Sequence, residues 1–81
     1  MMYYNERKIL ILEAMAELPE ADANEICEIL GDATLPTIAM ALLHYHRQGL
    51  LTREKRGGFY RYRLTTKGYE RLIYLTNIEQ Q

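Results

Sequence analysis

The stretch 31–65 reads GDATLPTIAMALLHYHRQGLLTREKRGGFYRYRLT. Its first half predicts the end of one helix at Gly31, since glycine readily adopts the left-handed conformation found at helix C-termini. A second helix follows over residues 35–48, because Thr34 is a good N-cap residue and Pro36 suits a first helical turn. Two helices joined by so short a turn meet at a steep angle, which is typical of a helix-turn-helix.

The second half of this stretch predicts a β-hairpin over residues 50–65. We expect one strand over 50–55, a tight turn over 56–58 and a return strand over 59–65. The return strand alternates with period two, with Tyr60, Tyr62 and Leu64 on one side and Phe59, Arg61 and Arg63 on the other. Such alternation indicates one packed and one solvated face, so we expect the two tyrosines to join the core.

Three further helices are predicted outside this stretch, at residues 6–18, 22–30 and 66–78. The pattern Asp22-x-x-Glu25 fits a capping box at the start of the second of them. Apolar residues at helical spacing predict the buried stripes, which are Ile9, Leu12 and Ala16 in the first helix and Ile26, Ile29 and Leu30 in the second. All 81 residues are therefore expected to form one mostly helical α+β domain.

The predicted order is helix, helix, turn, helix, hairpin, helix, which is the order of the winged helix-turn-helix fold. Residues 37–51 (TIAMALLHYHRQGLL) resemble the third helix of that superfamily and the glycine–leucine entry into its wing. Residues 61–68 (RYRLTTKG) are similar to the Y-x-L-T-x-x-G run that closes the wing in small MarR- and PadR-like transcriptional regulators of bacteria and archaea. The resemblance extends over residues 6–75 and implies a three-helix core, a two-stranded β-hairpin wing and a C-terminal helix.

The same resemblance implies a DNA-binding transcriptional regulator. In such proteins the third helix enters the major groove of double-stranded DNA and the wing lies along the phosphate backbone. Base edges require hydrogen-bonding side chains near the front of a helix, and phosphates require positive charge at the rim. On the third helix and its cap, the candidate DNA-binding residues are Thr34, Thr37, Met40, His44 and Arg47.

The charge distribution also favours a polyanionic partner. The net charge is −1, yet residues 1–46 hold two basic and eight acidic side chains, whereas residues 47–71 hold eight basic and two acidic ones. The wing candidates for phosphate contact are Arg53, Lys55, Arg56, Arg61 and Arg63. If about five cations neutralise phosphates, log K should fall with log salt at a slope of about −4 to −5. We expect the wing and the third helix to share one exposed flank, with the acidic front half pointing elsewhere.

Two alternatives remain open at this point. The cations of the wing have an alternative explanation without nucleic acid, because arginine and lysine on an exposed strand also prevent edge-to-edge aggregation of strands. In addition, Ala39, Met40 and Leu43 make the outer side of the third helix apolar, which suits a protein–protein interaction module in a larger complex. The first two turns of this helix contain no Asn, Gln or Arg, so few base-specific hydrogen bonds are expected.

The sequence gives no indication of catalysis, of a metal or cofactor site, or of a small-molecule ligand. His44 and His46 lie two residues apart on a helix and therefore point about 200° away from each other. Cys27 is the only cysteine and cannot form an internal disulfide, which fits a reducing cytoplasm. No apolar run approaches the roughly 18 residues of a membrane span, and no secretory signal is evident. We expect a cytoplasmic prokaryotic protein that is not an enzyme.

The last predicted helix is more apolar than packing in a small domain requires. We expect part of it to form a homodimer interface, whose candidate residues are Tyr69, Leu72, Ile73, Leu75 and Ile78. Tyr3 and Tyr4 are candidates to join that interface. A two-fold dimer would hold two recognition helices about one DNA turn apart, roughly 34 Å, and predicts a palindromic operator.

Overall fold

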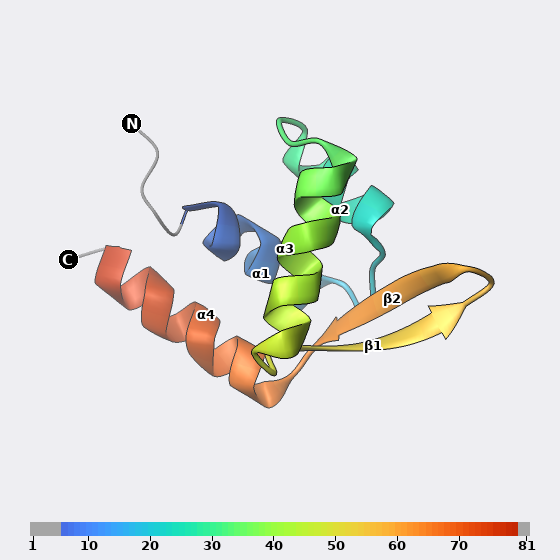
Figure 1. Ribbon diagram of the computed structural model, residues 1–81. Coiled ribbons are helices and arrows are strands. Elements are labelled where there is room, and N and C mark those ends of the chain that lie inside the picture. The colour runs from blue at the N-terminus through green and yellow to red at the C-terminus, as the bar shows by residue number, and fades with distance from the viewer. Residues whose placement is uncertain (1–5, 80–81) are drawn as a thin grey trace.

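The computed structural model describes residues 6–79 of the chain. Its elements are α1 (Glu6–Glu17), α2 (Ala23–Leu30), α3 (Leu35–Arg47), β1 (Leu51–Arg56), β2 (Phe59–Leu64) and α4 (Thr66–Glu79). Figure 1 shows α3 lying across α1, the hairpin projecting from one side of the helices, and α4 running away on the other side. The type and order of the elements are as predicted, and their outer bounds differ from the prediction by no more than one residue.

The turn between α2 and α3 has the geometry of a helix-turn-helix. The capping box at α2 is present, since Asp22 Oδ1 accepts the Glu25 N–H (2.9 Å) and Glu25 Oε1 accepts the Asp22 N–H (3.0 Å). Gly31 ends α2 at φ 77°, and Thr34 caps α3 by accepting the Thr37 N–H. The two helices meet at 117°. Of the helices described, none is alone long and apolar enough to cross a membrane, although α2 and α3 taken together as a bent pair meet that test by length and composition.

The hairpin turns over two residues only. Gly57 and Gly58 both have positive φ, at 57° and 94°, as a type I′ turn requires. Arg56, expected in the turn, is instead the last residue of β1 and pairs with Phe59. A primed two-residue turn matches the right-handed twist of the two strands, which allows them to stay paired up to the tip.

A short backbone bridge ties the hairpin to the loop between α1 and α2. Ala21 exchanges two hydrogen bonds with Tyr62 of β2, at 3.0 and 2.8 Å. Neighbouring residues on an extended segment point to opposite faces, so Ala21 and Tyr62 turn into the core. Glu20 and Asp22 therefore lie on the other face, beside the hairpin residues that point away from the core.

The core lies where α1, α2, α3 and the base of the hairpin meet. Its fully buried large side chains are Ile11, Leu12, Met15, Ile26, Ile38, Leu42, Leu50 and Leu51. The predicted stripe of α1 was partly wrong, since Ile9 and Ala16 are only half-buried whereas Ile11 is fully buried. The reason is that α1 packs against α2, β2 and α4, so its buried face is wider than a single stripe and rotated from the expected one.

The prediction that Ile29 is buried was also wrong. Its side chain is 56% exposed, because α2 packs mainly against α1 and α3 and its remaining side lies on the surface. Together with Leu10 of α1 it lines an open groove on the acidic side of the molecule.

Gly68 provides a test of how α4 docks. A Cβ at this position would collide with the Leu50 carbonyl oxygen and would lie 2.6 Å from Leu64 Cδ1. Glycine to alanine in an exposed helix normally stabilises by about 1 kcal/mol. Here we expect Gly68→Ala to lower the free energy of unfolding by about 1–3 kcal/mol, because the backbone at Leu50 cannot move freely.

Urea denaturation followed by circular dichroism measures this effect. Glu70→Ala, at an exposed position of the same helix, is the control and should leave the midpoint nearly unchanged. A Gly68→Ala variant as stable as the wild type would contradict the close packing of α4 on the hairpin base.

Candidate nucleic-acid interface

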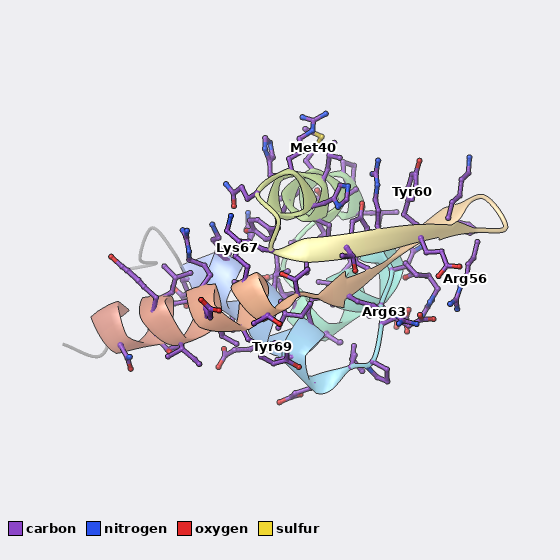
Figure 2. All side chains as sticks on the ribbon, turned by 90° about the horizontal axis from the view of Figure 1, so that it is seen from below. Met40, Arg56, Tyr60, Arg63, Lys67 and Tyr69 are labelled. Atoms are coloured by element: carbon purple, nitrogen blue, oxygen red, sulfur yellow. The ribbon has the colours of Figure 1, made fainter. Side chains whose placement is uncertain are left out.

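The outer surface of α3 carries a ridge of four residues at helical spacing. Pro36, Met40, Leu43 and Arg47 follow one another at intervals of four, three and four, and three of them are exposed. Met40 is 53% exposed and projects from α3 in Figure 2. The ridge is apolar up to its last residue, as the sequence predicted. It offers van der Waals contact along its length and one guanidinium at its C-terminal end.

The polar candidates on α3 lie beside this ridge. Thr34 and Thr37 are exposed at the start of the helix, and their hydroxyl oxygens share a hydrogen bond of 2.9 Å. His44 is exposed two turns further on. All three stand on the surface together with Met40, so the structure brings the predicted α3 residues onto one side of the molecule.

The five cations of the hairpin do not all lie on one face. Residues paired directly across two antiparallel strands point to the same side. Arg53 pairs with Tyr62 and Lys55 with Tyr60, so these two cations share the side that faces α3. The other side carries Arg56, Arg61 and Arg63, opposite Phe59, Glu54 and Thr52. In Figure 2, Tyr60 points to the same side as Met40, whereas Arg56 and Arg63 point to the other.

The three arginines on the far side are held by carboxylates. Glu20 pairs with all of them, at 2.7 Å to Arg56, 2.8 Å to Arg61 and 3.2 Å to Arg63. Arg61 also pairs with Glu25 at 2.9 Å and with Asp22 at 3.5 Å. Hydrogen bonds from Arg61 hold the pKa of Glu20 below its ordinary value, and Glu20 in turn raises the pKa of Arg61.

This network corrects one expectation from the sequence. The acidic front half does not point away from the wing, because Glu20, Asp22 and Glu25 pack against its far face. The Ala21–Tyr62 bridge is the cause, since it runs the acidic loop alongside β2. Arg61, expected on a solvated face, is half-buried as a result.

The cations on the α3 side are not compensated in this way. The Arg53 guanidinium lies 4.0 Å from the ring centre of Tyr60, a cation–π contact that supports the side chain without neutralising it. Tyr60 is 41% exposed, so the prediction that it belongs to the core was wrong, whereas Tyr62 is buried. Among the residues that the structure describes, no carboxylate lies within 4.0 Å of Arg47, Arg53 or Lys55.

Three cations near α3 were missed by the sequence analysis. Arg7 and Lys8 of α1 line a groove along the outer side of α3, with Thr37, Met40, His44 and Gln48. Lys67 of α4 lies beside Gly49, at the end of α3, and points to the same side as Met40 in Figure 2. The only signal was that Arg7 and Lys8 are the sole basic residues before position 47.

The remaining polar candidates have structural partners. His46 Nδ1 lies 3.0 Å from the Leu51 carbonyl oxygen, and its ring meets Tyr62 edge-on at 6.5 Å between centres. The Cys27 thiol donates a hydrogen bond to the Ala33 carbonyl oxygen at 3.0 Å. Within residues 6–79, no group of three His, Cys, Asp or Glu side chains is arranged to hold a metal ion.

The predicted dimer residues on α4 fall into two groups. Tyr69 and Ile73 are exposed and Leu72 is half-buried, whereas Leu75 is 6% exposed and so is occupied by packing within the chain. Tyr74, not named from the sequence, is also exposed. The side chain of Ile78, and Tyr3 and Tyr4, fall outside what the structure describes.

Comparison with solved structures bears on the arrangement as a whole. The chain superposes on an antimony-specific transcriptional repressor, AntR, with a TM-score of 0.73 and 18% identity, covering 96% of this chain and 74% of that one. The fold is a winged helix-turn-helix. A MarR family protein from Bacillus stearothermophilus gives a TM-score of 0.75 and 19% identity, covering 91% of this chain and 52% of that one, so the present chain spans about half its length. HlyU from Vibrio cholerae gives a TM-score of 0.61 and 19% identity, covering 99% of this chain and 100% of that one.

At these identities the likeness establishes the fold of the chain. No family model matches the sequence, and no curated protein matches it either. In the terms of this winged helix, α3 is the helix that follows the turn and β1 and β2 form the wing. The expected three-helix core, two-stranded wing and C-terminal helix are thereby confirmed.

The Glu20 network predicts an acid-dependent stability. The pKa of Glu20 in the folded protein lies below its ordinary value of 4.5. The ion pairs of Glu20 therefore stabilise the wing fully when the pH is above 4.5. The stabilisation is lost as the pH falls through the folded-state value. We expect Glu20→Gln to be less stable than the wild type near neutral pH, and this difference to shrink as the pH is lowered below 4.5.

Urea midpoints measured across this pH range test the expectation. Glu17→Gln, at an exposed position of α1 that makes no ion pair within the described residues, removes the same charge as a control. A gap between wild type and Glu20→Gln that stays constant down to acid pH would count against the network.

Proposed function

We propose that this protein is a DNA-binding transcriptional regulator that inserts α3 into the major groove. One observation carries the proposal: the cations beside α3 have no carboxylate partner within the described residues, whereas those on the far side of the wing are neutralised. Uncompensated cations around an exposed helix attract a polyanion, and duplex DNA releases its own counterions when they bind. The likeness of the chain to an antimony-specific transcriptional repressor and to a MarR family protein supports the same function.

Within this proposal, Arg53 and Lys55 are the wing contacts to phosphate. Tyr60 holds the Arg53 guanidinium against its ring on the α3 side, so the side chain is oriented before DNA arrives. Arg56, Arg61 and Arg63, also candidates from the sequence, are paired with Glu20 on the far side of the wing, so they are not proposed as phosphate contacts. Their proposed role is to hold the angle of the wing.

The contacts of α3 are proposed from its ridge. Met40 offers apolar contact to a thymine methyl group, and Arg47 reaches a phosphate or a guanine edge. Thr34, Thr37 and His44 supply hydrogen bonds at one side of the ridge. Because α3 has so few hydrogen-bonding side chains, most of the affinity comes from contacts with the phosphate backbone of DNA, and sequence selectivity is modest. A regulator of this kind acts on the chromosome, in the cytoplasm of a prokaryotic cell, and by binding rather than by catalysis.

A second candidate function rests on the exposed apolar ridge itself. Ala39 and Met40 are exposed and Leu43 is half-exposed, a surface that also fits a protein partner in a larger complex. Under this alternative, duplex DNA of random sequence would not bind at low salt.

We further propose that the protein acts as a homodimer through the exposed side of α4. Tyr69, Ile73 and Tyr74 are apolar or aromatic side chains left on the surface of one helix. A two-fold pair of such faces would bury them and would present two α3 helices to one duplex.

The DNA proposal is tested by titrating a fluorescent duplex of random sequence at several salt concentrations. We expect binding at low salt with a steep salt dependence. Arg53→Ala/Lys55→Ala should reduce the magnitude of the slope of log K against log salt by about 2, since each lost phosphate contact removes about 0.9. Arg56→Ala/Arg63→Ala removes the same charge from the far side and should change the slope much less. Absence of binding by the folded wild type would exclude the DNA function.

The dimer proposal is tested by sedimentation velocity at micromolar concentration. We expect a dimer for the wild type and a monomer for Ile73→Asp, because an aspartate in the centre of the exposed face would be buried without a partner. Asn24→Asp adds the same charge at an exposed polar position of α2, away from α4, and should remain a dimer. A monomeric wild type would refute the interface.

A further inference from the structure

The groove between the start of α1 and the outer side of α3 extends beyond the interface predicted from the sequence, because Arg7, Lys8 and Gln48 were not among the candidates. Arg7 and Lys8 enter it from α1, Thr37, Met40 and His44 from α3, and Gln48 from the C-cap of α3. It lies on one side of the α3 ridge. A second groove, lined by Leu35, Ala39 and Tyr60, lies between α3 and the wing. The exposed ridge of α3 is thus bordered by α1 on one flank and by the wing on the other.

Lys8 is held in a defined position in this groove. Its Nζ donates a hydrogen bond to Gln48 Oε1 at 3.1 Å and lies 5.1 Å from the ring centre of Tyr45. An ammonium has three N–H donors, so the amide oxygen and the ring face leave at least one for a further acceptor. Tyr45 belongs to α3 and Gln48 is its C-cap residue, so the position of the ammonium is fixed relative to the helix proposed to enter the major groove of DNA.

The charges around Lys8 are of the same sign. Arg7 precedes it on α1, and partial burial, together with the positive charge of Arg71 on α4, lowers the pKa of Lys8. Within the described part of the chain, no carboxylate pairs with any of the three, the neighbouring Glu6 included. Two of these cations also occupy the first turn of α1, where the helix dipole disfavours positive charge. The cluster is therefore electrostatically unfavourable until an anion enters it.

We propose that Arg7 and Lys8 form a second phosphate-binding site that binds the DNA strand on the flank of α3 opposite the wing. The inference rests on the proposed DNA function and extends it. The major groove is about 12 Å wide and has a phosphate strand along each rim, so a helix lying in it has phosphates on both sides. Arg53 and Lys55 face one rim, and Arg7 and Lys8 face the other. Phosphate is the proposed ligand because the guanidinium of Arg7 and the ammonium of Lys8 offer N–H donors and positive charge.

The test compares the salt dependence of DNA binding in matched double variants. Arg7→Gln/Lys8→Gln should reduce the magnitude of the slope of log K against log salt by about 2, and Arg53→Ala/Lys55→Ala should reduce it by a similar amount. If the magnitude of the slope is smaller by about 2, raising the salt concentration from about 50 to about 200 mM weakens DNA binding by a factor roughly tenfold smaller than in the wild type. The two losses should add, because the pairs contact different phosphates.

Two controls separate a local site from a general effect of charge. Arg56→Ala/Arg63→Ala changes the net charge equally but should leave the slope nearly as in the wild type. Arg7→Lys keeps the charge and should keep the slope. The second site would be overturned, and the DNA function left intact, if the far-side pair reduced the slope equally or if Arg7→Gln/Lys8→Gln left the slope unchanged. A wild type that does not bind DNA would refute both proposals.

A measurement on the unmodified chain covers the case in which a variant fails to fold. On addition of the same duplex, the amide resonances of Arg7 and Lys8 should shift together with those of α3. Shifts in α3 and the wing without shifts at Arg7 and Lys8 would overturn the site.

Discussion

The wing keeps its position because three guanidinium groups of the hairpin share one carboxylate. Glu20 accepts all three, and it stands one residue before Ala21, whose backbone is hydrogen-bonded to Tyr62 of the return strand. The bridge fixes the register of the loop against the strand, and the ion pairs fix the side chains around it. An isolated two-stranded hairpin is at best marginally stable in water, so these contacts help to hold the wing against the rest of the domain.

The same contacts give the molecule an electrical polarity. Carboxylates of the front half meet arginines on the far face of the wing, and the positive charge that remains uncompensated lies beside α3. Arg53 and Lys55 contribute to it from the wing, Arg47 from α3, and Arg7 and Lys8 from α1. A chain with a net charge near zero can therefore present a strongly positive flank. Net charge alone would not have suggested this.

The composition of α3 fits a helix whose phosphate contacts are made mainly by the elements beside it. Its ridge is apolar over most of its length, so it is poorly equipped to distinguish bases by hydrogen bonds. Its capping threonines and the flanking cations are suited to contacts with the phosphate backbone of DNA instead. A wing and an α1 that both hold phosphate strands would orient the helix firmly in the groove, and pairing of two chains through α4 would add selectivity through the spacing of half-sites.

The sequence by itself determined the secondary structure and its order, because caps, glycines and hydrophobic spacing are local signals. The Asp22 capping box, the Gly57–Gly58 turn and the alternation of β2 each act within a few residues. Only the tertiary structure decided which charges meet. Glu20 and the arginines of the wing are far apart in the chain, as are Lys8 and Gln48, and no local pattern records that packing brings each set together. For the same reason the sequence placed Arg7 and Lys8 in an acidic half, whereas the fold lays them beside α3.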